Sequence, residues 1–357
     1  MKIATIVGAR PQFIKAAVVS RAIHDAAGIE EILIHTGQHF DANMSDVFFD
    51  ELDIRRPDYQ LGIGGGTHGQ NTGRMIEAIE EVLMEVSPDK VLVYGDTDST
   101  LAAALAAVKL HIPIAHVEAG LRSFNRRMPE EINRVLTDHV ADLLFTPTDT
   151  AVRNLKKEGI DGQKVHQVGD VMYDATLFYR DRAKRPTNDG EVDGFVLCTI
   201  HRAENTNDMA RLNCILEALN TIAAEHTVIL PIHPRTAGVI KKLPDMQLNP
   251  SVRIIEPVGF LEMNWLLQHC SSVITDSGGV QKEAFFHCKP CVTLRDETEW
   301  VELLKAGANC LAPPGEADIL NVFRSMQGIS IDDTLRLYGD GHAGKKTVEL
   351  LIQASIP

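Results

Sequence analysis

Acidic side chains follow two apolar runs in the first half of the chain. Asp96 stands one glycine after Lys90–Tyr94, and Glu118 follows Ile114–Val117 directly. Glu130 comes immediately after a proline, a residue that suits the first turn of a helix. Carboxylates gathered in one crevice repel each other, which moves their pKa values apart. One site thereby obtains both a general acid and a general base, so the pattern predicts proton-transfer chemistry.

Other interpretations of these acids are open. Asp96 or Asp98 could cap the helix that follows, and the Asp-x-Asp sequence also suits a divalent metal held with a nucleotide diphosphate. Glu130 and Glu131 stand in the first turn of a helix, where the helix dipole favours negative charge in any protein. Against this last interpretation, the same segment is crowded with arginines, namely Arg122, Arg126, Arg127 and Arg134.

A cationic segment follows the first apolar run, Ile3–Val7. Gly8 lets the chain turn tightly, and Pro11 suits the start of a helix. Arg10 then stands at a helix N-terminus, where backbone N–H groups already favour an anion, and Lys15 follows on the same helix. Taken alone, the segment fits an anion site and a tight turn with a solvated arginine equally well.

The second half places histidines after two of its apolar runs. His201 follows Phe195–Thr199, with Arg202 beside it, and could bind phosphate or move a proton. His233 ends the next predicted strand in a similar way. A single histidine after a strand is more often structural, but the charged neighbours of His201 make the two interpretations even.

A glycine-rich loop stands later in the second half. Ser277, Gly278 and Gly279 lead from an apolar run into a helix, and such a loop brings phosphate oxygens close to backbone N–H groups. Glu283 lies near the start of that helix, where an acid can accept two ribose hydroxyls. Arg295 begins a highly charged loop after another apolar run and is expected at the same crevice. The alternative is a flexible loop that only caps the helix.

Short β-branched apolar runs alternate with amphipathic stretches in both halves, which predicts parallel sheets with helices on both faces. The predicted strands are Ile3–Val7, Glu31–Thr36, Lys90–Tyr94, Ile114–Val117, Leu143–Thr146, Val165–Val168, Phe195–Thr199, Thr227–Pro231, Val252–Ile255, Ser272–Thr275 and Cys291–Leu294. The clearest predicted helices are Pro11–Ala26, Thr72–Val86, Met209–Ala224, Val280–His287 and Ala343–Ala354.

The length of 357 residues suggests two domains, at about 100–200 residues each. We predict an α/β protein with two Rossmann-like, doubly wound domains and a ligand-binding cleft between them. Residues 1–170 would form the first domain with the carboxylates, 171–340 the second, and 341–357 a terminal helix that packs back on the first. Tyr179–Gly194 is polar and without apolar periodicity, so it is the best linker candidate.

The overall charge narrows the class of ligand. The chain has 35 Lys and Arg against 49 Asp and Glu, a formal net charge of −14. This argues against nucleic-acid and membrane-surface partners, which require an extended basic face, but leaves room for a small anion held by a local cluster. No run approaches the ~20 apolar residues of a membrane span, and we expect a cytoplasmic protein. Six cysteines make no disulfide framework, and Cys288-x-x-Cys291 is a weak redox or zinc signal.

The motifs, taken in order, resemble those of the non-hydrolysing UDP-N-acetylglucosamine 2-epimerases. They are Gly-x-Arg-Pro-x-x-Ile-Lys from Gly8, Gly-Asp-Thr from Gly95, His-Val-Glu-Ala-Gly-Leu-Arg from His116 with Pro-Glu-Glu-x-Asn-Arg from Pro129, His-Arg-x-Glu-Asn from His201, and Asp-Ser-Gly-Gly-x-Gln-x-Glu-Ala from Asp276. The resemblance covers nearly the whole chain and implies a glycosyltransferase-B-like fold. The reaction it implies eliminates UDP across carbons 1 and 2 of the sugar and adds it back with carbon 2 inverted.

The resemblance also implies roles for individual residues. The acid–base carboxylates would be Asp96, Glu118 and Glu130, and His201 would join them at the reaction centre. Substrate and diphosphate would be held by Arg10, Lys15, Arg134 and His201, phosphate by Ser277, Gly278 and Gly279, the ribose by Glu283, and the substrate further by Arg295. No metal or redox cofactor is implied, which displaces the metal interpretation of Asp-x-Asp. The family expectation is a homodimer.

Several segments depart from the family pattern. Members activated by their own substrate carry a second Gln where this chain has Asp41, and an Arg that the segment Gly64–Gly69 lacks, so allosteric activation is not expected. The segments Gly8–Phe13 and Arg295–Glu302 resemble the branch acting on UDP-2,3-diacetamido-2,3-dideoxyglucuronate. This acidic sugar would need an extra cation, which Arg126 or Arg127 could supply. Competing classes are a glycosyltransferase of the same fold, a nucleotide-sugar binding protein and a hydrolysing epimerase.

Overall fold

The computed structural model describes residues 1–38, 49, 52–187, 194–232, 234–240, 247–315 and 317–354. The chain divides into two compact units: unit 1 comprises Met1–Leu177 with Leu337–Pro357, and unit 2 comprises Phe178–Arg336. The terminal segment therefore returns to unit 1. Three features of the sequence analysis lie outside the described residues, namely Asp41, His233 and positions 188–193 of the expected linker.

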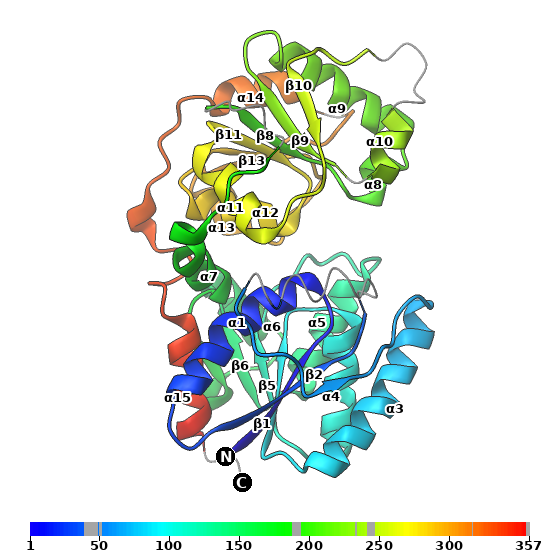
Figure 1. Cartoon of the computed structure of the whole chain (residues 1–357). Helices are drawn as coiled ribbons and strands as arrows, with labels where there is room; N and C mark the ends of the chain where they lie inside the picture. The colour runs from blue at the N-terminus through cyan, green and yellow to red at the C-terminus, as the bar shows by residue number, and fades with distance from the viewer. Residues whose placement is uncertain are drawn as a thin grey trace. The chain divides into compact units, whose positions relative to one another are not determined.

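Unit 1 is built on a seven-stranded sheet in the order β3-β2-β1-β4-β5-β6-β7, and every pairing is parallel (Figure 1). Its strands are β1 (Lys2–Val7), β2 (Glu30–His35), β3 (Tyr59–Gln60), β4 (Lys90–Tyr94), β5 (Ile114–Val117), β6 (Leu143–Thr146) and β7 (Val165–Gln167). Because β1, β4 and β5 are neighbours and parallel, the turns after them lie at one edge of the sheet.

The helices of unit 1 cover its sheet. They are α1 (Arg10–Asp25), α3 (His68–Val86), α4 (Asp98–Lys109), α5 (Pro129–Val140), α6 (Asp149–Lys157), most of α7 (Val171–Tyr179) and α15 (Ala343–Gln353), with a 3₁₀ turn η1 (Gly162–Lys164). Apolar side chains of α3, α4 and α6 form one buried core with β1, β4 and β5. The terminal helix α15 packs against α1 (Figure 1).

Unit 2 has a six-stranded parallel sheet in the order β10-β9-β8-β11-β12-β13. Its strands are β8 (Val196–Thr199), β9 (Val228–Pro231), β10 (Val252–Ile255), β11 (Ser272–Thr275), β12 (Cys291–Thr293) and β13 (Asn309–Leu311). Val196 and Cys198 enter one buried core, whereas Phe195 and Leu197 enter a second. This alternation shows that both faces of the sheet are covered, as in doubly wound folds.

The helices of unit 2 divide between these two cores. They are α8 (Ala203–Thr206), α9 (Met209–Ile222), α10 (Pro234–Ile240), α11 (Phe260–His269), α12 (Gly278–Phe286), α13 (Val301–Lys305) and α14 (Ile319–Met326), with 3₁₀ turns η2 (Arg180–Arg182) and η3 (Asp333–Leu335). Apolar residues of α9 and α14 line the first core, and those of α11 and α12 line the second. The prediction of two Rossmann-like α/β domains is confirmed.

The sequence analysis missed β3 and β13, which are the short edge strands of the two sheets. Two or three residues are too few to show an alternating apolar pattern. The predicted linker begins next to the boundary between the units, although its first residue still belongs to a helix. Tyr179 ends α7, is fully buried and packs edge-on against Phe260 in unit 2. The contact boundaries fall at 177 and 336, where the sequence analysis expected 170 and 340.

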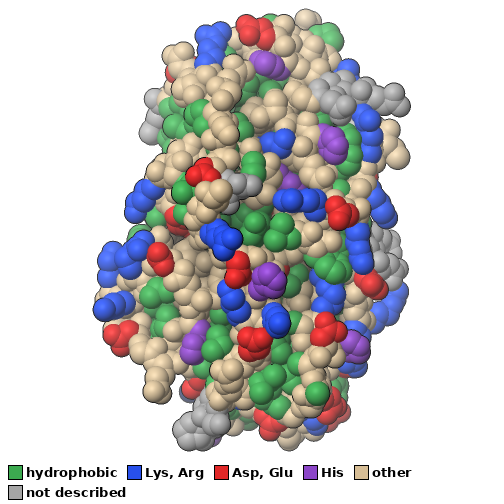
Figure 2. Space-filling model, turned by 90° about the vertical axis from the view of Figure 1, so that its left-hand side faces the viewer, with side chains coloured by type: hydrophobic (Ala, Val, Ile, Leu, Met, Phe, Trp, Pro, Cys, Tyr) green, Lys and Arg blue, Asp and Glu red, His purple; other side chains and the backbone are tan. Residues whose placement is uncertain are grey.

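Two further observations concern the helices and the charged surface. No described helix is long and apolar enough to cross a membrane. On the face shown in Figure 2, Lys and Arg side chains alternate with Asp and Glu and form no continuous basic surface.

The two cysteines of the Cys-x-x-Cys pair differ in burial, because Cys288 is exposed and Cys291 is buried. Burial raises the pKa of Cys291 to about 12, whereas a reactive thiol has a lowered pKa.

Candidate active site

The polar candidates of unit 1 stand at the ends of three neighbouring strands. Gly8 follows β1, Asp96 follows β4 after one glycine, and Glu118 follows β5 directly. Helix α5 lies next to α4 and carries Glu130 and Arg134. Ligands of parallel α/β sheets bind outside the carboxyl ends of the strands, so this edge is the expected position for a site.

Glu118 and Lys15 form a buried ion pair. Each residue is 8% exposed. Gly95 lies against the pair, because an ideal Cβ on this glycine would stand 3.1 Å from Lys15 Nζ and 3.2 Å from Glu118 Oε2. Glu118 has a φ of 72°, a left-handed conformation that costs a non-glycine residue about 1–3 kcal/mol. The surrounding structure thus holds Glu118 in a strained conformation, a feature that clusters at functional sites.

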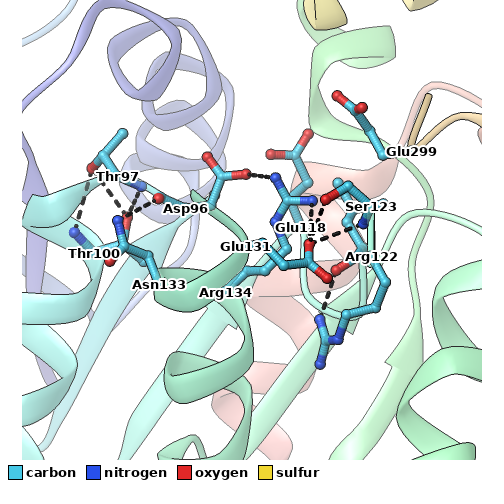
Figure 3. A network of polar contacts seen from close by, with 12 residues as sticks. Asp96, Thr97, Thr100, Glu118, Arg122, Ser123, Glu131, Asn133, Arg134 and Glu299 are labelled. Carbon is cyan, nitrogen blue, oxygen red and sulfur yellow. Dashed lines mark hydrogen bonds and ion pairs between the residues drawn. The ribbon is translucent and has the colours of Figure 1, made fainter. Parts of the chain in front are cut away.

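A second ion pair joins Asp96 to Arg134, with 2.6 Å between Asp96 Oδ2 and Arg134 Nη2 (Figure 3). Nη1 of Arg134 donates to Glu131 Oε2 at 3.2 Å. The Asp96 side chain is 28% exposed and that of Arg134 only 5%. Asn133 Nδ2 donates to the backbone oxygen of Asp96 at 2.9 Å. Helix α5 therefore fixes both the main chain and the side chain of Asp96.

The two adjacent acids of α5 have different environments. Glu131 is buried and accepts hydrogen bonds from the N–H groups of Ser123 and Phe124, both at 2.9 Å, so it orders the loop before α5. Glu130 is exposed and makes no hydrogen bond or ion pair with any described residue. Successive helical residues point about 100° apart, which turns Glu131 inward and Glu130 away from it. The structure does not bring Glu130 into contact with the other candidate carboxylates.

The turn after β1 is fixed by Gln12, which the sequence analysis missed. Its Oε1 accepts from the N–H groups of Gly8 at 2.8 Å and Ala9 at 3.0 Å, and its Nε2 donates to the backbone oxygen of Tyr94 at 2.8 Å. This buried side chain ties the turn to the end of β4. Arg10 begins α1 and is half-buried. A glutamine three residues after the cap position was the available signal.

Asp98 is engaged in a different way from Asp96. Its Oδ2 lies 2.7 Å from Nδ1 of His68, and its Oδ1 accepts from Asn133 Nδ2 at 3.1 Å. The cap of α4 is Thr97, so the interpretation that Asp96 or Asp98 caps this helix is wrong. Within the part of the chain that the structure describes, no group of three or more His, Cys, Asp or Glu side chains could hold a metal ion.

In unit 2, His201 is anchored by the buried Asp276. His201 Nδ1 lies 3.0 Å from Asp276 Oδ1, while 60% of the His201 side chain is exposed. Asp276 also accepts from the N–H groups of His201 and Arg202 and from Asn205 Nδ2, each at about 3.1 Å. Burial alone would raise the pKa of Asp276, but these donors, with His201 first, hold it below its ordinary value. The contact with Asp276 thus orients the His201 ring, while most of the ring is exposed to solvent.

The glycine-rich loop forms the start of α12. Ser277 is the N-cap, and its hydroxyl accepts from the N–H of Val280 at 3.4 Å, so the capping interpretation is confirmed for this residue. The N–H groups of Gly278 and Gly279 make no hydrogen bond with the described residues. They remain as donors at a helix N-terminus, which is the arrangement that binds phosphate. Glu283 Oε1 would lie 3.7 Å from an ideal Cβ on Gly279.

Arg295 lies beside this loop but is already paired. It is buried, and its Nη1 donates to Glu299 Oε2 at 3.0 Å. An ideal Cβ on Gly278 would stand 2.6 Å from Glu299 Oε1 and 3.9 Å from Arg295 Nη1. The sequence analysis did not single out Glu299, although its position in a charged loop after a strand was the signal. The Arg295–Glu299 pair borders the space next to Gly278.

Comparisons with known proteins agree with these motifs. The family model described as UDP-N-acetylglucosamine 2-epimerase matches residues 21–352. A UDP-2,3-diacetamido-2,3-dideoxy-D-glucuronate 2-epimerase of Pseudomonas aeruginosa is 58% identical, over 98% of this chain and 99% of that protein.

Solved structures give the same result. The UDP-GlcNAc 2-epimerase of Methanocaldococcus jannaschii, in complex with UDP-GlcNAc and UDP, is 42% identical with a TM-score of 0.90, over 99% of this chain and 100% of the other. The UDP-GlcNAc 2-epimerase of Neisseria meningitidis, bound to UDP-GlcNAc, is 30% identical with a TM-score of 0.90, over the same shares of the two chains. This chain therefore belongs to the UDP-N-acetylglucosamine 2-epimerase family.

Proposed function

We propose that this enzyme inverts carbon 2 of UDP-N-acetylglucosamine without hydrolysing it. The observation that carries the proposal is the pair of carboxylates, Asp96 and Glu118, that follow neighbouring strands and each face a buried cation, in a chain of this family. Carboxylates can take and return protons, and cations can stabilise a leaving diphosphate.

The proposed reaction balances without a metal or redox group. A carboxylate removes the proton on carbon 2, the bond from carbon 1 to the diphosphate oxygen breaks, and a double bond forms between carbons 1 and 2. UDP then adds back to carbon 1 while an acid delivers a proton to the opposite face of carbon 2. Asp96, Glu118 and Glu130 are the proposed acid–base set.

The two ion pairs suggest how substrate binding would activate unit 1. Lys15 is paired with Glu118, and Arg134 is paired with Asp96. An incoming diphosphate competes for both cations, because it carries more charge than either carboxylate. Binding would thereby free Glu118 and Asp96 to exchange protons with the sugar. Arg10, at the start of α1, would add a further positive group.

Unit 2 is proposed to hold the nucleotide. The open N–H groups of Gly278 and Gly279 and the hydroxyl of Ser277 suit the phosphates. Glu283 would accept the ribose hydroxyls, with Arg295 positioned by Glu299 beside the loop. His201 would contact the diphosphate and take part in its departure.

Turnover in deuterated water tests the reaction. The product and recovered substrate should carry deuterium at carbon 2, since the removed proton exchanges with solvent.

Asp96→Asn and Glu130→Gln should each lower kcat by about 10²–10⁴, the usual contribution of a general acid or base. A product free of label would refute the elimination mechanism, and near-normal kcat in either variant would remove that residue from the set.

UDP-2,3-diacetamido-2,3-dideoxyglucuronate is a second candidate substrate. It is favoured by the 58% identical relative and by two exposed arginines, Arg126 and Arg127, that form no ion pair with a described residue. Parallel assays of kcat/KM with both nucleotide sugars decide between them. If the uronate is the substrate, Arg126→Ala or Arg127→Ala should lower kcat/KM for it by about tenfold, the value of one lost charged hydrogen bond.

We also propose a homodimer, as the family resemblance implies, located in the cytoplasm, as the N-terminal sequence suggests. Light scattering coupled to size-exclusion chromatography measures the oligomeric state directly.

The competing glycosyltransferase function requires an acceptor, so conversion of the nucleotide sugar alone would exclude it. Release of free sugar, detected by NMR, would instead indicate a hydrolysing epimerase.

A further inference from the structure

A completely buried histidine, His116, contacts the turn that carries Asp96. His116 lies within β5 and is 0% exposed. Its Nε2 is 2.7 Å from the backbone oxygen of Gly95, and its Nδ1 is 2.7 Å from Oδ1 of Asp138. The ring therefore joins the turn after β4 to helix α5. No step of the proposed reaction uses either side chain.

Both neighbours of the ring accept hydrogen bonds. A backbone carbonyl can only accept, so the proton on Nε2 is required. Asp138 already receives two donors on Oδ2, from the N–H of Gly120 at 3.0 Å and from Arg122 Nη1 at 2.7 Å. Burial alone would raise the pKa of Asp138, but His116 and Arg122 hold it below its ordinary value. An ionised Asp138 also calls for a proton on Nδ1.

The charges of the network balance when the ring is doubly protonated. Arg122 forms two hydrogen bonds of 2.7 Å with the carboxylate of Glu158, which reaches the surface. His116 and Arg122 then supply two positive charges against those of Asp138 and Glu158. The alternative, a neutral ring facing a protonated Asp138, would place the acid proton next to a guanidinium group that favours the ionised form.

We propose that His116 is held as an imidazolium by Asp138 and is a positioning residue for the epimerisation. This rests on the proposed function. Through His116, Asp138 holds the carbonyl of Gly95, the residue before Asp96. Through its Oδ2, Asp138 holds the N–H of Gly120, two residues after Glu118. One buried carboxylate thus sets the separation of the turns that carry Asp96 and Glu118.

Two neutral variants of His116 separate positioning from bulk stability. In His116→Gln the amide nitrogen reaches the position of Nε2 and can still donate to Gly95. In His116→Asn the nitrogen reaches only the position of Nδ1, so the Gly95 carbonyl loses its donor. Both variants remove the same charge opposite Asp138, but His116→Gln also removes the donor to Asp138 Oδ1, which His116→Asn can keep, so the stability of each variant is measured by thermal unfolding.

We expect kcat to fall about a hundredfold in His116→Asn, the cost of misplacing a catalytic group by about 1 Å, and much less in His116→Gln, with KM little changed in both. Circular dichroism verifies that the variants fold. An equal loss of kcat in the two variants would indicate a structural role only and overturn the proposal, as would normal kcat in both.

The ring itself can be observed in the unaltered chain. With ¹⁵N-labelled histidine, assigned by comparison with His116→Gln or, if that variant does not fold, by through-bond connectivities, NMR should show two protonated ring nitrogens for His116. A single protonated nitrogen would overturn the proposal whether or not either variant folds. This measurement needs no turnover. If the enzyme fails to epimerise the nucleotide sugar, the proposed function fails while the imidazolium is still tested.

Discussion

The carboxyl edges of the two sheets differ in how they hold charge. In unit 1, Glu118 and Lys15 are buried and paired with each other, and the Glu118 backbone is strained. In unit 2, the His201 ring is largely exposed above a buried acid, and the N–H groups at the start of α12 make no hydrogen bond with the described residues. Unit 1 thus holds paired and largely buried charges, whereas unit 2 presents open donors.

This difference suggests a division of labour between the units. Preorganised, partly dry charges stabilise a transition state most effectively, because they need no rearrangement during the reaction. Open donors that hold the part of UDP remote from carbon 1 meet little change in charge during the reaction, so they improve affinity rather than rate. Changes in unit 1 should therefore alter kcat, and changes in unit 2 should alter KM.

Among the variants that compare the two units, Glu118→Gln has the largest expected effect. The amide retains the shape of the side chain but cannot take a proton, so kcat should fall about 10³-fold, within the range for a lost general acid or base. Steady-state kinetics measure kcat and KM, and circular dichroism checks the fold. Lys15 loses its charge partner in this variant, so thermal unfolding should also occur at a lower temperature.

The matched change in unit 2 is His201→Asn. It removes an exposed ring and leaves the backbone donors of Asp276 in place. Because His201 is proposed to assist the departing diphosphate, we expect kcat to fall, but by less than in Glu118→Gln, together with a rise in KM. If this variant lowers kcat as much as Glu118→Gln does, the division of labour between the two units is wrong.

The sequence predicted the architecture well because its signals are local. Each central strand is a short apolar run, and the candidate residues follow such runs directly, as Asp96 and Glu118 do. The edge strands β3 and β13 escaped because two or three residues show no periodicity. Tyr179 looked like linker because its burial depends on a contact with Phe260, a residue distant in sequence.

The partners of the candidate residues could not be predicted. That Glu118 pairs with Lys15, 103 residues away, and that Asp96 pairs with Arg134 are consequences of sheet order. From the sequence, Glu130 and Glu131 differ only in the acid–base role that the family resemblance gives to Glu130. The helical rotation between them makes one a buried ligand of loop N–H groups and leaves the other exposed.

Asp174, unlike Glu118, is a buried carboxylate of unit 1 that forms no ion pair with a described residue. It lies on α7, where Oδ2 accepts from the N–H of Gly344 at 2.8 Å, while Oδ1 has no hydrogen-bond partner among the described residues. Burial raises its pKa to about 6. Its contribution to stability is therefore fully present below the unfolded pKa of about 3.8 and is lost as the pH rises through about 6.

Asp174→Asn should accordingly raise the free energy of unfolding of unit 1 at pH 7.5 by about 2 kcal/mol. Asparagine keeps an acceptor for Gly344 and cannot ionise. Urea unfolding at pH 7.5 and pH 4 measures the effect, and the variant should match the unaltered chain at the lower pH. A variant that is less stable at both pH values would show that the buried carboxylate is compensated by groups other than Gly344.

Gly278→Ala gives the smallest of these effects and probes the open edge of unit 2. The added Cβ would stand 2.6 Å from Glu299 Oε1, so the Glu299 side chain must move and the phosphate can no longer approach the backbone closely. We expect UDP affinity, measured by calorimetry, to fall about tenfold, or ~1.4 kcal/mol, with kcat changed less than KM. Gly279→Ala changes the other proposed phosphate-binding glycine and is the matched comparison, because its nearest protein contact is an ordinary 3.7 Å to Glu283 Oε1. Equal losses in the two variants would mean that backbone freedom, and not space beside Glu299, governs the loop. A fall in kcat without a change in UDP affinity would show that the start of α12 acts in catalysis. The proposed difference in function between the two sheet edges would then be wrong.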